Sequence, residues 1–122
     1  MNRKIQYIET SWFKKDFKKL IKRFKTLKGD LDVLKRNQIE LLHLFEIDND
    51  GTFKLKGYRN PNYSIYKIKK IACKSLKGKG SKSGLRLIYA FNQNSIQISL
   101  LEIYYKGDKE NEDYDRIKKF LL

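Results

Sequence analysis

LRLIYAFNQNSIQISLLEIYY, residues 85–105, is the stretch that decides the fold. In residues 85–91 one set of alternate positions carries Leu, Leu, Tyr and Phe, which is the period-two pattern of a β-strand. Asn92-Gln93-Asn94 predicts a hairpin turn. Residues 95–105 are apolar on both sides, which predicts a strand at a central position. We therefore expect an antiparallel hairpin at the centre of a sheet.

The residues before this hairpin predict one strand and two helices. Arg3 to Glu9 is short and β-prone, and Thr10 and Ser11 are good N-caps for a following helix. Gly29 can end that helix, and Asp30 can cap a second one that continues to about Glu46. The first helix has apolar side chains at steps of four, three, four and three residues, namely Phe13, Phe17, Leu20, Phe24 and Leu27.

The other segments complete the order β-α-α-β-β-β-α. Asp48-Asn49-Asp50-Gly51 is interpreted as a turn, because residue 59, where a calcium loop needs Glu, is Arg. Residues 65–76 are β-prone at their start, residues 77–84 predict a flexible Gly- and Lys-rich loop, and residues 113–122 predict a closing helix. We expect one α+β domain over residues 1–122, with a helical hairpin on one face of a small, curved, mainly antiparallel sheet and the other face open.

Composition excludes several classes of protein. The 122 residues include one Cys and one His, which excludes a disulfide scaffold, a four-Cys zinc site and a His-pair nuclease. His43 lies among leucines and is more often a packed residue than a catalyst. The 15 Tyr and Phe residues exclude a disordered basic tail. Without a long apolar run or a signal peptide, we expect a cytoplasmic protein that binds no membrane and no cofactor.

The charge is high and unevenly placed. The chain has 28 Lys and Arg against 14 Asp and Glu, which gives a net charge of +14. Residues 51–100 contain eleven basic residues and no acidic one, whereas residues 30–50 have a net charge of −4. A lysine-rich genome explains many lysines but not fifty residues without an acid. The middle of the chain is therefore expected to face a polyanion.

The basic region offers a small set of residues for phosphate chemistry. Lys67 and Lys69 share a strand face, and crowded ammonium groups lower one another's pKa, so that either can serve as a base. Arg86 projects from an otherwise apolar strand and needs a partner. That partner is either a bound phosphate or a carboxylate such as Glu112. The loop at 77–84 lacks the spacing of a nucleotide-binding loop, and no acidic pair is present in this region to hold Mg²⁺.

Several segments together resemble the RelE/ParE superfamily of bacterial toxins. They are FKKDFKKL at 13–20, IYKIK at 65–69, GKGSKSGLRLIY at 78–89 and LLEIYYKGDKENED at 100–113. The resemblance covers nearly the whole chain. It implies a small α+β sheet with a helical hairpin on one face.

The resemblance also implies an activity and its residues. RelE-like and HigB-like members cut mRNA through attack of the ribose 2′-OH, leaving a 2′,3′-cyclic phosphate, whereas ParE-like members inhibit DNA gyrase and cut nothing. By similarity, Lys67, Lys69 and Arg86 match catalytic positions, and Tyr114 matches the C-terminal Tyr. The family's second catalytic Arg has no clear match. The residues expected to bind the RNA backbone are Lys77, Lys79, Lys82, Lys106 and Lys109.

These observations favour a type II toxin that acts as a metal-independent mRNA endoribonuclease. Its expected partners are a cognate antitoxin, mRNA and the ribosome. Two alternatives stay open, a gyrase inhibitor of the ParE kind and a basic RNA-binding module without cleavage.

Overall fold

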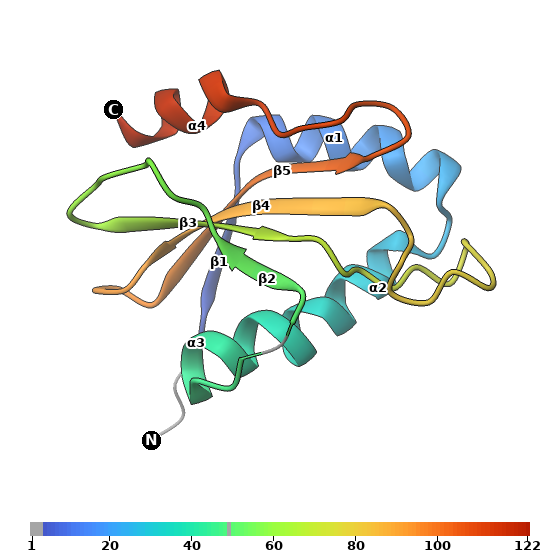
Figure 1. The fold of residues 1–122 in the computed structure, drawn as a ribbon, viewed down its shortest axis with the longest axis horizontal. Coiled ribbons are helices and arrows are strands. Elements are labelled where there is room, and N and C mark those ends of the chain that lie inside the picture. Colours follow the sequence, from blue (N-terminus) through green and yellow to red (C-terminus); the bar gives the residue numbers. More distant parts are fainter. Residues whose placement is uncertain (1–3, 49) are drawn as a thin grey trace.

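One five-stranded sheet organises the chain in a computed structural model that describes residues 4–48 and 50–122. The strand order is β1-β5-β4-β3-β2, with β1 parallel to β5 and all other pairs antiparallel (Figure 1). The α+β prediction is confirmed. The strands are β1 (Gln6–Glu9), β2 (Thr52–Lys54), β3 (Tyr63–Ile68), β4 (Leu85–Asn92) and β5 (Gln97–Tyr105).

The hairpin of β4 and β5 lies at the centre of the sheet, as its sequence predicts. Its register shifts once, because Ile88 lies opposite Glu102 whereas Tyr89 lies opposite Leu100. Leu101 is the extra residue of this bulge. A bulge reverses the alternation of the side chains that follow it. Leu100 therefore shares a face with Ile103, while Leu101 shares the opposite face with Tyr104.

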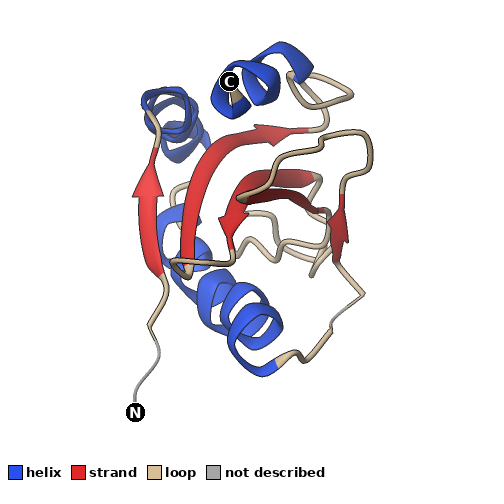
Figure 2. Cartoon of the chain, turned by 90° about the vertical axis from the view of Figure 1, so that its left-hand side faces the viewer, coloured by secondary structure: helices blue, strands red, loops and turns tan. Residues whose placement is uncertain are grey.

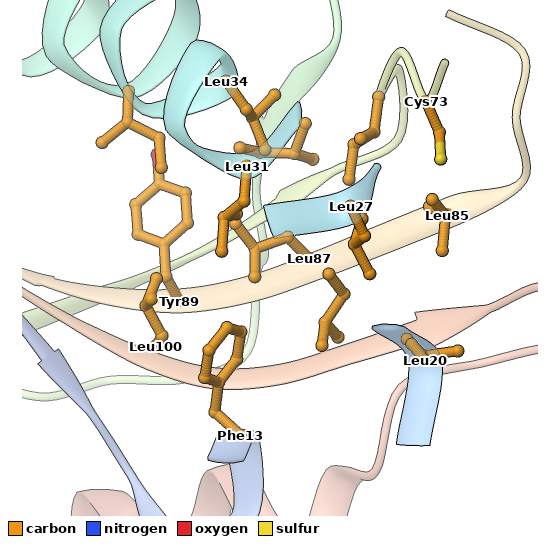
Figure 3. Close-up of a cluster of buried hydrophobic side chains, with 14 of the residues drawn as sticks. Phe13, Leu20, Leu27, Leu31, Leu34, Cys73, Leu85, Leu87, Tyr89 and Leu100 are labelled. Atoms are coloured by element: carbon orange, nitrogen blue, oxygen red, sulfur yellow. The ribbon is translucent and has the colours of Figure 1, made fainter. Parts of the chain in front are cut away.

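Three helices and a π-helical segment cover the first face of the sheet. They are α1 (Ser11–Arg23), α2 (Leu27–Leu34), η1 (Lys35–Glu40) and α3 (Leu41–Phe45). Figure 2 shows the helices packed beside and beneath the strands. The core between the layers contains Phe13, Leu27, Leu31, Leu87 and Tyr89 (Figure 3). The apolar stripe along residues 13–27 is therefore buried against the sheet.

The boundary between the first two helices differs from the prediction. α1 ends at Arg23, and Gly29 and Asp30 lie inside α2 rather than at the junction. The break occurs at Thr26, whose N–H and hydroxyl each lie 2.9 Å from the hydroxyl of Ser75. Asp30 is buried and accepts hydrogen bonds from the Thr26 hydroxyl and the Lys74 N–H. A contact 49 residues away along the chain sets this break, so local signals could not reveal it.

The second face of the sheet is not open, and that expectation is wrong. Helix α4 (Tyr114–Leu121) packs Ile117 against Ile88, Ala90 and Leu101. In Figure 1, α4 lies on the opposite side of the sheet from α2 and α3. The apolar stripe of α4 requires a surface to bury against, and apolar residues of β4 together with the bulge residue Leu101 supply it. Leu55, Tyr58 and Tyr63 cover more of this face.

Smaller differences concern the strands. β2 was not expected, and the predicted β-prone segment 65–76 contributes only to β3, which begins at Tyr63 and ends at Ile68. Arg3 of the predicted first strand and Asn49 of the predicted turn lie outside the described residues. In the described part of the chain, no helix has the length and apolar character that crossing a membrane requires.

Side chains occupy the edge of β5 beyond the end of β1. The carboxylate of Asp16 accepts a hydrogen bond from the Ile103 N–H at 3.3 Å. Arg116 donates from Nη1 to the Leu101 carbonyl at 3.0 Å and to Asp16 at 2.7 Å. One ion pair between α1 and α4 therefore satisfies both an N–H and a C=O of the strand edge.

His43 is packed in the helix–sheet interface, as expected. Its ring stacks on Phe91 at 4.0 Å between centroids and contacts Tyr66 edge-on. Its Nε2 lies 2.7 Å from the hydroxyl of Tyr89. Burial lowers the pKa of His43 from 6.5 to about 4. The ring is therefore neutral at physiological pH.

This pKa predicts a loss of stability in mild acid. Between pH 6.5 and 4 the unfolded chain binds a proton at residue 43 that the folded chain excludes, so stability falls as the pH falls. Urea unfolding at about pH 7.5 and about pH 5 should give a decrease about 1 kcal/mol larger for the wild type than for His43→Gln. Glutamine keeps a partner for Tyr89 but does not titrate. Equal decreases in both proteins would contradict the assignment.

Candidate functional site

A polar cavity of about 260 Å³ lies on the second face of the sheet. It forms where β3 ends, where β4 begins and where the segment after β5 crosses them. Lys67 and Arg86 project into this face because the alternation of each strand places them opposite the helix layer. The residues lining the cavity are Lys67, Lys69, Arg86, Lys106, Glu110 and Asn111. The structure thus brings together both strand lysines, Arg86 and Lys106.

Lys67 is held in a buried ion pair. Its Nζ lies 2.5 Å from Oε1 of Glu112, and the two side chains are only 9% and 8% exposed. Burial, the largest single influence, opposes the charge of Lys67, but the hydrogen bonds and electrostatic attraction of Glu112 and Tyr104 together outweigh it, so the pKa of Lys67 is raised. The pKa of Glu112 is lowered, because the hydrogen bond and charge of Lys67, together with hydrogen bonds to the backbone and Tyr104, outweigh the opposing effect of burial. The expectation that crowding lowers the pKa is therefore wrong for Lys67.

Arg86 is oriented by the backbone rather than by an acid. Its Nη1 donates to the Lys69 carbonyl at 2.8 Å and to the Leu85 carbonyl at 3.1 Å. Among residues 4–48 and 50–122, no carboxylate forms an ion pair with it. The alternative partner, Glu112, is instead bound to Lys67. A guanidinium fixed on one side by carbonyls keeps its remaining N–H groups for an anion.

Tyr104 lies beneath the cations and was not predicted as part of the site. It is opposite Arg86 in the β4–β5 register. The ammonium groups of Lys67 and Lys109 lie 5.7 and 5.2 Å from the centre of its ring, within the range of cation–π contacts. Burial is the main cause of its raised pKa. Simple alternation from Leu100 places Tyr104 on the helix face, and the bulge at Leu101 is what moves it to this one.

The segment from Lys106 to Asp113 is tied to the sheet along its length. The Lys106 N–H donates to the Gly84 carbonyl at 2.8 Å. Lys109 forms an ion pair with the buried Glu102, which also accepts the Asp113 N–H at 2.8 Å. These contacts place Lys106 in the cavity and direct Lys109 to Glu102. Glu110 and Asn111 were missed because a polar stretch after a strand carries no signal of what it crosses.

The remaining predicted residues lie outside the cavity. Lys77, Lys79 and Lys82 are exposed on the loop before β4, and of these Lys77 lines a separate hollow with Cys73. Tyr114 is the first residue of α4 and is 50% exposed. It lies close enough to Tyr58 to contribute, after burial and Glu112, to the raised pKa of that residue. The roles of these residues stay predictions.

Comparison with known proteins identifies the fold. No family model and no curated protein sequence matches the chain. A solved structure, the archaeal RelE–RelB complex from Pyrococcus horikoshii OT3, contains a chain of similar fold at 16% sequence identity. The match covers 86% of this chain and 98% of that chain, with a TM-score of 0.50. The chain therefore has a RelE-like fold, as the sequence resemblance predicts.

The buried ion pair gives a test of the site's construction. Lys67→Met leaves the Glu112 carboxylate buried without a partner, which should lower the free energy of unfolding by about 3 kcal/mol. The double variant K67M/E112Q removes the stranded charge and should be more stable than K67M. Urea unfolding measures both. A loss below about 1 kcal/mol in K67M would contradict this account of the pair.

Proposed function

We propose that the chain is the toxin of a type II toxin–antitoxin system and that it cleaves mRNA at this cavity. The observation that carries the proposal is the state of Arg86. Its guanidinium is fixed by two backbone carbonyls in a cationic cavity and has no acid paired with it in the described part of the chain. Arginine held in this way suits the oxygens of a phosphodiester.

The reaction would use the ribose 2′-OH as nucleophile. Its oxygen forms a bond to the adjacent phosphorus while the bond to the 5′-oxygen breaks, leaving a 2′,3′-cyclic phosphate and a 5′-hydroxyl. Negative charge grows on the phosphate oxygens during this step, so fixed cations lower its barrier. Arg86, Lys69 and Lys106 are assigned to those oxygens. Tyr114 is proposed to position a base through its exposed ring.

Lys67 has a different role in this proposal from the base that its sequence position suggests. A lysine whose pKa is raised by a buried carboxylate keeps its proton. Lys67 is therefore assigned to holding Glu112, and with it the segment after β5, in place beside the phosphate, because that carboxylate balances its charge. The proton acceptor must be another group.

Binding of the RNA backbone would rest on the charge of residues 51–100. The loop lysines Lys77, Lys79 and Lys82 are exposed and free of acidic neighbours in sequence. Contacts of this kind weaken steeply as salt rises, because bound counterions are released on binding. Lys109 contributes less, since Glu102 neutralises it. The ribosome is the proposed place of action, because it holds mRNA within a surface that is itself largely RNA and therefore attracts a basic protein.

A cognate antitoxin is the proposed protein partner. The similar archaeal protein was solved as a RelE–RelB complex. For this chain, an antitoxin with an acidic segment would complement the cationic cavity and keep RNA out of it. The complex would form in the cytoplasm.

Substitution of Arg86 tests the function directly. Arg86→Ala should keep the fold and reduce cleavage by about 100-fold or more, because one oriented cation is removed from the transition state. Arg36→Ala, an exposed arginine on the helix layer, is the matched control and should cleave like the wild type. Induced expression, growth curves and mapping of mRNA 5′ ends measure the effect.

The same experiment separates the alternatives. A wild-type protein that blocks supercoiling by purified gyrase and leaves mRNA intact would be an inhibitor of the ParE kind. A protein that binds RNA but neither cuts it nor slows growth would be an RNA-binding module. Full toxicity of Arg86→Ala would refute the assignment of Arg86.

A further inference from the structure

Glu110 is the one carboxylate among the described residues that line the cationic cavity. The other lining residues are Lys67, Lys69, Arg86, Lys106 and Asn111. An acid in such surroundings usually forms an ion pair with one of the cations. Glu110 forms none within 4.0 Å in the part of the chain that the structure describes. Its side chain is exposed and so is accessible to a ligand.

Four acids near Glu110 differ from it in this respect. Each of them is engaged by a basic side chain: Glu102 by Lys109, Asp108 by Arg23, Glu112 by Lys67, and Asp113 by Arg116 at 3.9 Å. Asp113 also accepts the Arg116 N–H at the start of α4. These four acids hold the segment in place. Glu110 has no such structural role, although it lies on the same segment.

The proposed cleavage needs a proton acceptor, which the strand lysines do not readily supply. Lys67 keeps its proton through Glu112. A lysine at neutral pH generally has to lose a proton before it can act as a base, whereas a glutamate is generally ready to accept one. In the proposed function the cations around Glu110 hold the phosphate, which would place the adjacent ribose beside this carboxylate.

We propose that Glu110 is the general base of the reaction and accepts the proton of the ribose 2′-OH. This inference rests on the proposed function. The 2′-oxygen then attacks phosphorus, the bond from phosphorus to the 5′-oxygen breaks, and the departing oxygen takes a proton from the ammonium of Lys69 or Lys106. That ammonium recovers its proton from solvent, and Glu110 releases one to solvent. The substrate class is therefore RNA with a free 2′-OH at the cleaved position.

The test compares Glu110→Gln with the wild type in two assays. The first measures single-turnover cleavage of an mRNA on purified ribosomes. The second measures binding to the same ribosomal complex with a 2′-deoxy nucleotide at the cleaved position, which binds but cannot react. Glu110→Gln should cleave at least about 100-fold more slowly. It should bind the deoxy complex as tightly as the wild type or more tightly, since a negative charge beside the phosphate is removed.

Two further variants sharpen the test. Glu110→Asp keeps the carboxylate and should retain part of the rate. Glu46→Gln removes an exposed acid at the end of α3 and should leave both assays unchanged. The charged groups that face Glu110 across the cavity are Lys67, Lys69, Arg86 and Lys106.

The outcomes are distinguishable from those of the proposed function. If Arg86→Ala stops cleavage while Glu110→Gln cleaves within about threefold of the wild type, Glu110 is not the base although the enzyme is real. If Glu110→Gln loses binding together with cleavage, its role is to shape the site and the inference fails. If the wild type cuts no RNA, the proposed function fails and the inference fails with it.

Discussion

The buried ion pair between Lys67 and Glu112 is the constraint on which the site depends. It joins β3 to the segment that follows β5, and neither charge can leave without stranding the other away from water. Glu102 adds a second tie by accepting the Asp113 N–H and binding Lys109. The segment therefore stays across the sheet. Lys106, Glu110 and Asn111 face Arg86 because buried acids below them fix the backbone.

The net charge of the C-terminal segment does not reveal how its acidic and basic side chains are arranged. The last 22 residues carry five basic and six acidic residues and look nearly neutral in sequence. In the fold, four of the six acids form ion pairs with basic side chains, namely Glu102, Asp108, Glu112 and Asp113, whereas Lys106 lines the cavity. A surface can thus be more cationic than the segment that builds it. The pairing of charges also explains why Glu110, the one acid among the described residues that line the cavity, stands out in the structure and not in the sequence.

Periodic and local features of the sequence predicted much of the fold. The alternation of residues 85–91 and the shared face of Lys67 and Lys69 are properties of neighbouring positions, so the gathering of Lys67, Lys69 and Arg86 could be expected. Features that depend on contacts between residues far apart in the chain could not be predicted in this way. The helix break at Thr26 depends on Ser75, and the position of Tyr104 depends on the bulge at Leu101. Glu110 lies in the site only because ion pairs and hydrogen bonds hold residues 106–113 across the sheet.

The capped edge of β5 has a consequence for strand exchange with other chains. An unpaired strand edge is a template for β-augmentation, domain swapping and aggregation. Asp16 already holds the Ile103 N–H and Arg116 already holds the Leu101 carbonyl, so a visiting strand would find both groups occupied. At the opposite side of the sheet, the edge belongs to β2, next to β3. An extended peptide that paired with β2 would therefore be separated from β3, the strand that carries Lys67, by β2 alone.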